Sequence, residues 1–146
     1  MKKPQKITRV KLQIEEINDF ILFGLVSSEP DYKLSLALNK KLSVSLKNIS
    51  PVMIFGENEK ELLFSRFSDS SESPDRIFNL ISNRSGKYFL LKKLRNIDYI
   101  FHIHDPENRN IVSEITSSLR EIDTITAVFN IDIDSIKDRN LNLVIQ

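Results

Sequence analysis

The sequence predicts an α+β domain: a mainly antiparallel sheet of six or seven strands with two principal helices packed on it. Short apolar and β-branched runs recur along most of the chain, with turn residues between them. Only two segments show the apolar spacing of an amphipathic helix. The length of 146 residues is typical of a single domain and is enough to bury a core.

The first strand and helix are predicted at 20–42. The run FILFGLV at 20–26 has the length and the Phe, Ile and Val content of a strand buried on both faces. Ser28 precedes Pro30 and Asp31, which suggests a helix that is capped by Ser28 and has Pro30 in its first turn. The apolar face of this helix is formed by Leu34, Ala37, Leu38 and Leu42.

The middle of the chain predicts further strands joined by turns. Residues 51–55 and 61–67 flank a plausible hairpin loop at 56–60. Residues 76–82 and 87–91 flank a turn at Asn83-Arg84-Ser85-Gly86. The biased segment from Ser65 to Pro74 is expected to form a mobile loop between strands.

The last third predicts strand, helix and strand. In the strand at 96–104, Ile97, Tyr99, Phe101 and Ile103 share one face, and Asp98, Ile100, His102 and His104 share the other. Asp105 and Pro106 start a helix with an apolar stripe, and Asp105 is most simply its cap. A final strand is expected from Ile125 to Ile133, with Ala127, Phe129, Ile131 and Ile133 facing inward.

Composition limits the function classes. The chain has no cysteine, which excludes disulfides, thiolate metal sites and cysteine nucleophiles. No apolar run approaches the roughly 20 residues of a membrane span, and the basic N-terminus lacks the apolar region of a signal peptide. We therefore expect a cytoplasmic protein with no membrane contact.

The N-terminus differs from the rest of the chain. Lys2, Lys3, Lys6, Arg9 and Lys11 are basic, and the first eleven residues contain no acid. We expect residues 1–18 to form a basic arm and residues 19–146 a single α+β domain. Such an arm could contact nucleic acid or acidic lipid, although a solvated tail is the simpler interpretation.

Several short motifs resemble a known family. Residues 19–39 contain the pattern DFxLxGxxSxxxDYKLxxxLN, followed by NxSGKYxL from Asn83 and by Ile97-Asp98-Tyr99. With these motifs the chain resembles the small IPExxxVDY family of the Bacteroidetes over most of its length. Lys92 and Lys93 stand where the family has Pro and Glu. The resemblance implies a bacterial cytoplasmic protein and implies no activity.

The segment FHIHD contains the only two histidines. His102 and His104 share a strand face about 6.6 Å apart, so they could converge on one metal ion. A zinc site needs a further ligand, for which Asp132 and Asp134 are candidates if the two strands are parallel neighbours. The alternative is that His102 and His104 are polar residues on the less buried face of the sheet and that Asp132 and Asp134 are ordinary strand-end residues.

A second candidate site is basic and aromatic. Its candidate binding residues are Lys87, Tyr88, Lys92, Lys93 and Arg95. Positive charge beside aromatic side chains on a sheet is typical of several RNA-binding folds. The alternative is a basic edge strand whose lysines discourage strand addition.

No catalytic motif is visible, and no cofactor is predicted. A nucleophile elbow and a glycine-rich phosphate loop are both absent from the sequence. The first prediction is therefore a non-catalytic protein-interaction or adaptor domain with an unknown protein partner. One version is a homodimer formed through an uncovered sheet face. Nucleic-acid binding through the arm and 87–95 is the alternative, and metal-dependent activity at His102 and His104 is a further one.

Overall fold

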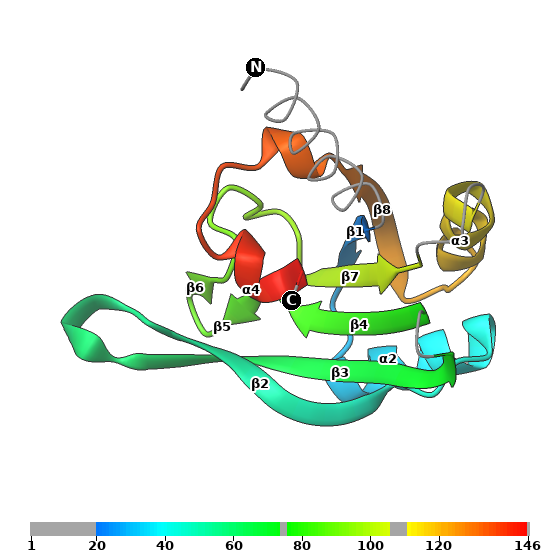
Figure 1. Ribbon diagram of the computed structural model, residues 1–146, viewed down its shortest axis with the longest axis horizontal. Coiled ribbons are helices and arrows are strands. Elements are labelled where there is room, and N and C mark those ends of the chain that lie inside the picture. The colour runs from blue at the N-terminus through cyan, green and yellow to red at the C-terminus, as the bar shows by residue number, and fades with distance from the viewer. Residues whose placement is uncertain (1–19, 74–75, 106–110, 146) are drawn as a thin grey trace, which may run out of the picture.

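The computed structural model describes residues 20–73, 76–105 and 111–145, which fold around a six-stranded antiparallel sheet (Figure 1). The strand order across the sheet is β2-β3-β4-β7-β1-β8. These strands are β1 (Phe20–Ser27), β2 (Lys47–Phe55), β3 (Glu61–Ser73), β4 (Arg76–Ser82), β7 (Tyr99–His104) and β8 (Ile125–Ile131). The predicted α+β class is confirmed.

The remaining elements cover the sheet or connect its strands. Strands β5 (Arg84–Ser85) and β6 (Tyr88–Phe89) form a separate two-stranded sheet. The helices are α2 (Asp31–Leu42), α3 (Ile111–Arg120) and α4 (Leu141–Ile145), and single 3-10 turns lie at Glu57–Glu59 and Ile133–Ser135. None of the helices within the described residues is long and apolar enough to cross a membrane.

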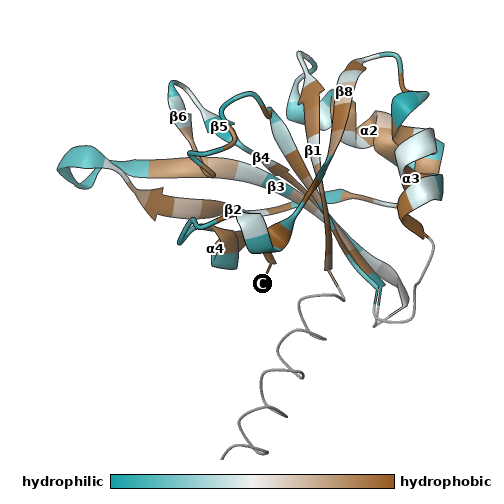
Figure 2. Ribbon diagram, turned by 90° about the horizontal axis from the view of Figure 1, so that it is seen from above, coloured by the Kyte–Doolittle hydropathy of each residue, from teal (hydrophilic) through white to brown (hydrophobic). Residues whose placement is uncertain are grey.

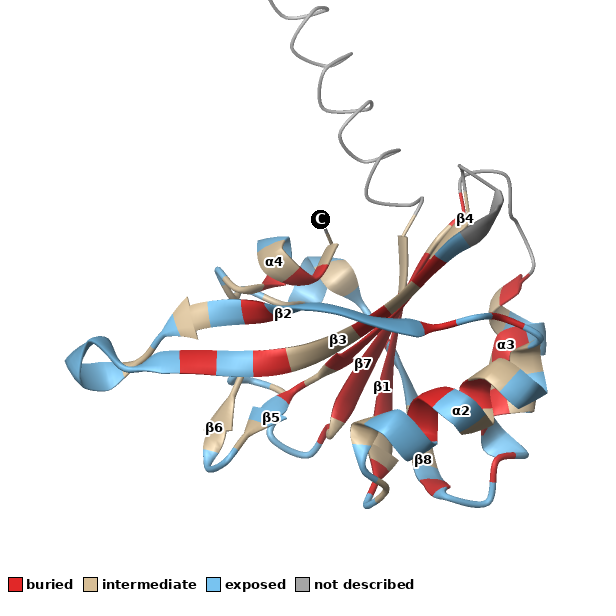
Figure 3. Cartoon of the chain, turned by 90° about the horizontal axis from the view of Figure 1, so that it is seen from below, coloured by how far each residue is buried: buried red, intermediate tan, exposed pale blue. Residues whose placement is uncertain are grey.

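One face of the sheet is covered by α2 and α3. Alternation along β7 directs Tyr99, Phe101 and Ile103 to this face, where they join Leu38 of α2 and Leu119 of α3 in one cluster. Figure 3 shows the buried residues of both helices turned toward the sheet. The predicted amphipathic patterns therefore describe this face well.

The opposite face, called the loop-covered face below, is covered by chain with little regular structure. The segment from 90 to 97 and the helix α4 pack on it, and Leu91, Ile97, Leu141 and Val144 join Ile100 of β7 in a second cluster. Ile97 belongs to this cluster and not to the face of Tyr99, because β7 begins only at Tyr99. Both faces of the sheet centre are thus covered.

Asn83 holds the irregular cover in place. Its side chain is fully buried, donates to the carbonyls of Leu94 and Ile97, and accepts from the amide of Leu91 at 2.8 Å. Its backbone N–H donates to the carbonyl of Asp98. One amide side chain therefore satisfies three backbone groups that no strand ladder reaches.

Several sequence expectations need correction. Ser28 does not cap α2: the residue before the helix is Pro30, and no side chain caps this end. The proposed loop at 65–74 is wrong for 65–73, which continue β3 as a long hairpin strand. Residues 87–91 add no strand to the main sheet, since only Tyr88–Phe89 is a strand and its partner is β5.

Candidate functional site

A basic and aromatic groove lies where three separate parts of the chain meet. It has a volume of about 610 Å³ and is bounded by the tip of the β2–β3 hairpin, by β6 with the residues after it, and by 137–140. In Figure 2 this hairpin extends well beyond the body of the sheet. The lining residues are Ile54, Phe55, Gly56, Glu57, Leu62, Tyr88, Phe89, Lys92, Lys93, Lys137, Asp138, Arg139 and Asn140.

Hydrogen bonds between distant parts of the chain hold the groove walls together. The backbone N–H of Lys92 donates to Oδ2 of Asp138 at 3.0 Å, which ties two walls to each other. The side chain of Asn140 donates to the carbonyl of Leu90 at 2.8 Å. At the hairpin tip, a Cβ on Gly56 would lie 2.8 Å from Leu62, so glycine allows the chain to pass close to that side chain.

The charge of the groove is predominantly positive. Its lining includes four cations, Lys92, Lys93, Lys137 and Arg139, and two acids, Glu57 and Asp138. Asp138 already accepts hydrogen bonds from the backbone amides of Lys92 and Asn140. These bonds hold Asp138 in the groove wall, and the four cations still outnumber the two acids of the lining.

Aromatic rings also line the groove, and cations from outside its lining lie over two of them. The ammonium groups of Lys60 and Lys87 lie 5.7 and 5.6 Å from the centroid of the Tyr88 ring. The guanidinium of Arg84 lies 5.0 Å from the Phe89 ring. Phe55 is 65% exposed at the rim. Rings that attract cations and a ring open to solvent are both present at one site.

The structure gathers most of the residues predicted at 87–95. Tyr88, Lys92 and Lys93 line the groove, and Lys87 lies over the Tyr88 ring. Arg95 does not line it; its backbone carbonyl accepts from Arg84. The basic arm at 1–18 lies outside the described residues.

Sequence reasoning missed most of the groove. Phe55, Lys137 and Arg139 are far from 87–95 in the chain, and only the fold brings them together. The alternation of Lys137 and Arg139 around Asp138 was a visible but weak signal. An exposed phenylalanine at the end of a predicted strand gave no signal of its own.

The two histidines lie on the loop-covered face near one end of β7. His102 is 2% exposed, and Asn79 lies 3.2 Å from its Nδ1. The Phe20 ring lies 5.1 Å from the His102 ring and 4.8 Å from the His104 ring. Burial, and then the like charge of His104, lower the pKa of His102 to about 4. Nε2 of His102 and Nδ1 of His104 are buried without a hydrogen-bond partner among the described residues.

The carboxylates proposed to complete a metal site are separated from the histidines. Strands β7 and β8 run in the same direction, but β1 lies between them. The strand adjacency assumed for Asp132 and Asp134 is therefore wrong. Asp132 instead accepts from the backbone N–H of Asp134. Across the described parts of the chain, no three His, Cys, Asp or Glu residues lie close enough to hold a metal ion.

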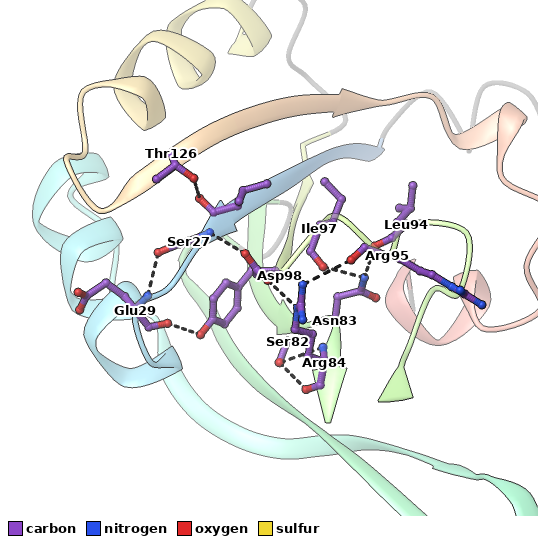
Figure 4. Close-up of polar contacts among 12 residues, drawn as sticks. Ser27, Glu29, Ser82, Asn83, Arg84, Leu94, Arg95, Ile97, Asp98 and Thr126 are labelled. Carbon is purple, nitrogen blue, oxygen red and sulfur yellow. Dashed lines mark hydrogen bonds and ion pairs between the residues drawn. The ribbon is translucent and has the colours of Figure 1, made fainter. Parts of the chain in front are cut away.

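A second hollow, of about 550 Å³, is lined in part by Asp98 and Tyr99. Both side chains are bonded to other residues of the protein (Figure 4). Asp98 accepts from the backbone N–H of Ser27 at 2.9 Å and pairs with Arg84 at 2.6 Å. The Tyr99 hydroxyl donates to the carbonyl of Glu29, and burial raises the pKa of Tyr99 to about 12. Both side chains are therefore held in structural contacts.

No family model, curated protein or solved structure matches this chain. The resemblance to the IPExxxVDY family therefore stays a prediction. Residues that carry this resemblance have structural roles in this fold: Asn83 and Asp98 hold loops, and Gly24 lies against Ile97.

Proposed function

We propose that this protein is a non-catalytic binding module whose groove holds single-stranded nucleic acid. The observation that carries the proposal is the combination, in one groove of about 610 Å³, of four cations with an exposed aromatic rim. Single-stranded nucleic acid offers phosphates to the cations and unstacked bases to the rings. The proposal follows the nucleic-acid alternative from the sequence and moves its centre from the N-terminal arm to the groove.

The ring of Phe55 supports a single strand over a duplex. The ring is 65% exposed and is not part of the core, so it can stack on a base without disturbing the fold. Stacking requires a base face, which a duplex keeps inside its own stack. Tyr88 and Phe89 are half-buried, and the cations over their rings, Lys60, Lys87 and Arg84, lie outside the groove lining, so these two rings shape the groove wall.

The ionisable groups support binding better than catalysis. The groove offers lysines, arginine and two carboxylates, and Asp138 is engaged by backbone amides. Glu57 is exposed and Asp138 is only half-buried, so neither carboxylate is enclosed in the way that a general acid requires. Metal-dependent activity at His102 and His104 has less support, because no third ligand is present among the described residues.

The test is fluorescence anisotropy of the full chain with labelled oligo(dT) and oligo(U) of about 12 nucleotides, between about 50 and 200 mM salt. The variant Lys92→Glu with Lys93→Glu should bind more weakly. The slope of log K against log[salt] should fall by about 1.4, because each phosphate that is no longer neutralised removes about 0.7 from it. Phe55→Ala should weaken binding by roughly tenfold, as expected when one base no longer stacks.

Two matched controls lie on α2. Lys33 and Lys40 are exposed, so Lys33→Glu with Lys40→Glu makes the same charge change away from the groove. Tyr32, 55% exposed, is the aromatic control for Phe55. If groove and control variants lose affinity equally, binding is a general charge effect and the groove is not the site. If heparin binds but neither oligonucleotide does, the groove binds polyanions without using bases.

A further inference from the structure

Arg84 connects the groove to the second hollow. It lies directly opposite Phe89 in the β5–β6 pair, and its guanidinium is 5.0 Å from the centroid of the Phe89 ring. Phe89 lines the groove, whereas Arg84 lines the second hollow, of about 550 Å³. The two hollows are therefore joined through the contact between one ring and one guanidinium.

The guanidinium of Arg84 is held in one orientation. Its Nε pairs with Oδ1 of Asp98 at 2.6 Å, and a terminal nitrogen donates to the carbonyl of Arg95 at 3.5 Å (Figure 4). Asp98 is itself anchored, because it accepts from the backbone N–H of Ser27. A planar cation that is already oriented loses less conformational freedom when a ligand packs on it.

Arg84 remains accessible in spite of these contacts. Its side chain is 48% exposed. The guanidinium lies over the Phe89 ring, so its open surface is on the side away from that ring. Guanidinium planes, like aromatic rings, are surfaces on which the unstacked bases of single strands pack. The open side of Arg84 is therefore suited to receive a base.

The charge of the second hollow suits a base better than a phosphate. Its lining contains one cation, Arg84, and two acids, Glu29 and Asp98. Arg84 is already paired with Asp98, so the hollow has no excess of positive charge to attract a phosphate. The rest of the lining is uncharged and includes Val26 and Pro30, which offer apolar surface. The groove, with four cations and two acids, has the opposite balance.

We propose that Arg84 is a base-stacking residue: a base of the strand that is bound in the groove enters the second hollow and packs on the Arg84 guanidinium. This inference rests on the proposed function. The cations of the groove bind the phosphates, and Arg84 adds a second stacking position to the one at Phe55. Between the groove and the second hollow, the strand passes over the β5–β6 pair, which contains both Arg84 and Phe89.

The test compares two labelled strands of about 12 nucleotides, oligo(dT) and a strand of equal length in which every nucleotide lacks its base. Both strands carry the same phosphates, so only contacts to bases distinguish them. Arg84→Lys retains the positive charge that pairs with Asp98 but removes the plane. In fluorescence anisotropy of the full chain, this variant should bind oligo(dT) roughly tenfold more weakly and the abasic strand as tightly as the wild type. The dependence of binding on salt should not change, because no phosphate contact is lost.

Matched variants separate base contacts from phosphate contacts. Arg120 is an exposed arginine on α3 that lines neither the groove nor the second hollow, so Arg120→Lys should leave both affinities unchanged. Lys92→Glu with Lys93→Glu should weaken binding to both strands, because it removes phosphate contacts. Thermal unfolding confirms that each variant is folded. In the wild type, the Nε–H resonance of Arg84 should shift when oligo(dT) is added and should not shift with the abasic strand.

The outcomes distinguish this inference from the proposed function. If Arg84→Lys binds oligo(dT) as tightly as the wild type while Phe55→Ala binds it more weakly, the groove stands and the stacking role of Arg84 is overturned. Equal losses on both strands also overturn it, because Arg84 would then act on phosphates or on the groove wall. A wild type that binds neither strand overturns the proposed function, and this inference with it.

Discussion

The two faces of the sheet are closed in different ways. On the helical face, α2 and α3 bury apolar side chains at helical spacing, and the contacts are spread over many residues. On the loop-covered face, the cover has few backbone ladder bonds and depends on single residues such as Asn83 and Gly24. A substitution on the loop-covered face should therefore release a whole segment of the cover, whereas one on the helical face should leave the rest of the packing in place. Only the loop-covered face supports the groove.

The largest effect is expected for Asn83→Ala. The substitution leaves the carbonyls of Leu94 and Ile97 and the amide of Leu91 without their partner inside the core. At about 1–3 kcal/mol for each orphaned buried group, the free energy of unfolding should fall by about 4 kcal/mol. Urea denaturation measures this, and hydrogen exchange should show the Leu91 amide opening first. A loss below about 1 kcal/mol would show that water replaces the side chain.

Leu38→Ala gives the matching change on the helical face. Leu38 is fully buried between α2 and the sheet. The lost methyl groups and the remaining cavity should cost about 3 kcal/mol. At temperatures where the variant is still folded, oligonucleotide affinity should equal that of the wild type, whereas Asn83→Ala should weaken binding by releasing one groove wall. Equal binding losses in both variants would remove the distinction between the faces.

Gly24→Ala tests a close approach on the loop-covered face. A Cβ at this position would lie 2.7 Å from Cδ1 of Ile97 and 3.2 Å from Cδ1 of Ile131. Overpacking of this kind should lower the free energy of unfolding by about 2 kcal/mol. Because the closest atom is the end of a side chain, Ile97→Val in the same chain should recover part of the loss. A double variant that shows no coupling would mean that the backbone moves instead.

The difference between the faces also explains what the sequence could predict. Most of the sheet and the two longer helices were readable, because their apolar residues form a continuous run, as in β1, or repeat with a period of 2 or 3.6; the second half of β3 has neither signal. The loop-covered face has no such period, since Asn83 is bonded to residues 8 to 14 positions away in a path that only the fold defines. A buried asparagine looks like an ordinary turn residue in the sequence.

The same limit applies to the candidate sites. Lys87, Tyr88, Lys92 and Lys93 were found because they are close together in the chain. Lys137 and Arg139 belong to the chain that follows β8. The position of β8 in the sheet decides whether this chain comes near residues 87–93, and the sequence does not show that position. The metal hypothesis failed for the same reason. It required β7 and β8 to be neighbours so that Asp132 could lie beside the histidines, but β1 lies between these two strands. Local chemistry was visible in the sequence, and long-range juxtaposition was not.

The smallest effect is expected from the protonation of His102, on the loop-covered face. Its pKa is lowered to about 4 in the folded protein, against about 6.5 when unfolded. The unfolded chain therefore binds the proton more readily, so this contribution to stability is present above pH 6.5 and is lost as pH falls toward 4. At pH 5.5 the loss should be on the order of 1 kcal/mol, because the unfolded histidine is then mostly protonated and the folded one is not.

Urea denaturation of wild type and His102→Gln at about pH 7.5 and 5.5 isolates this contribution, since carboxylate titration is common to both proteins. On going to the lower pH, the free energy of unfolding should fall by less in the variant than in the wild type. His104→Gln is the control: it removes the like charge that lowers the pKa of His102 but leaves the larger cause, burial, in place. It should therefore retain most of the acid sensitivity. If His102→Gln is as acid-sensitive as the wild type, the imidazole is reached by water and the loop-covered face is more open at this end than its packing indicates.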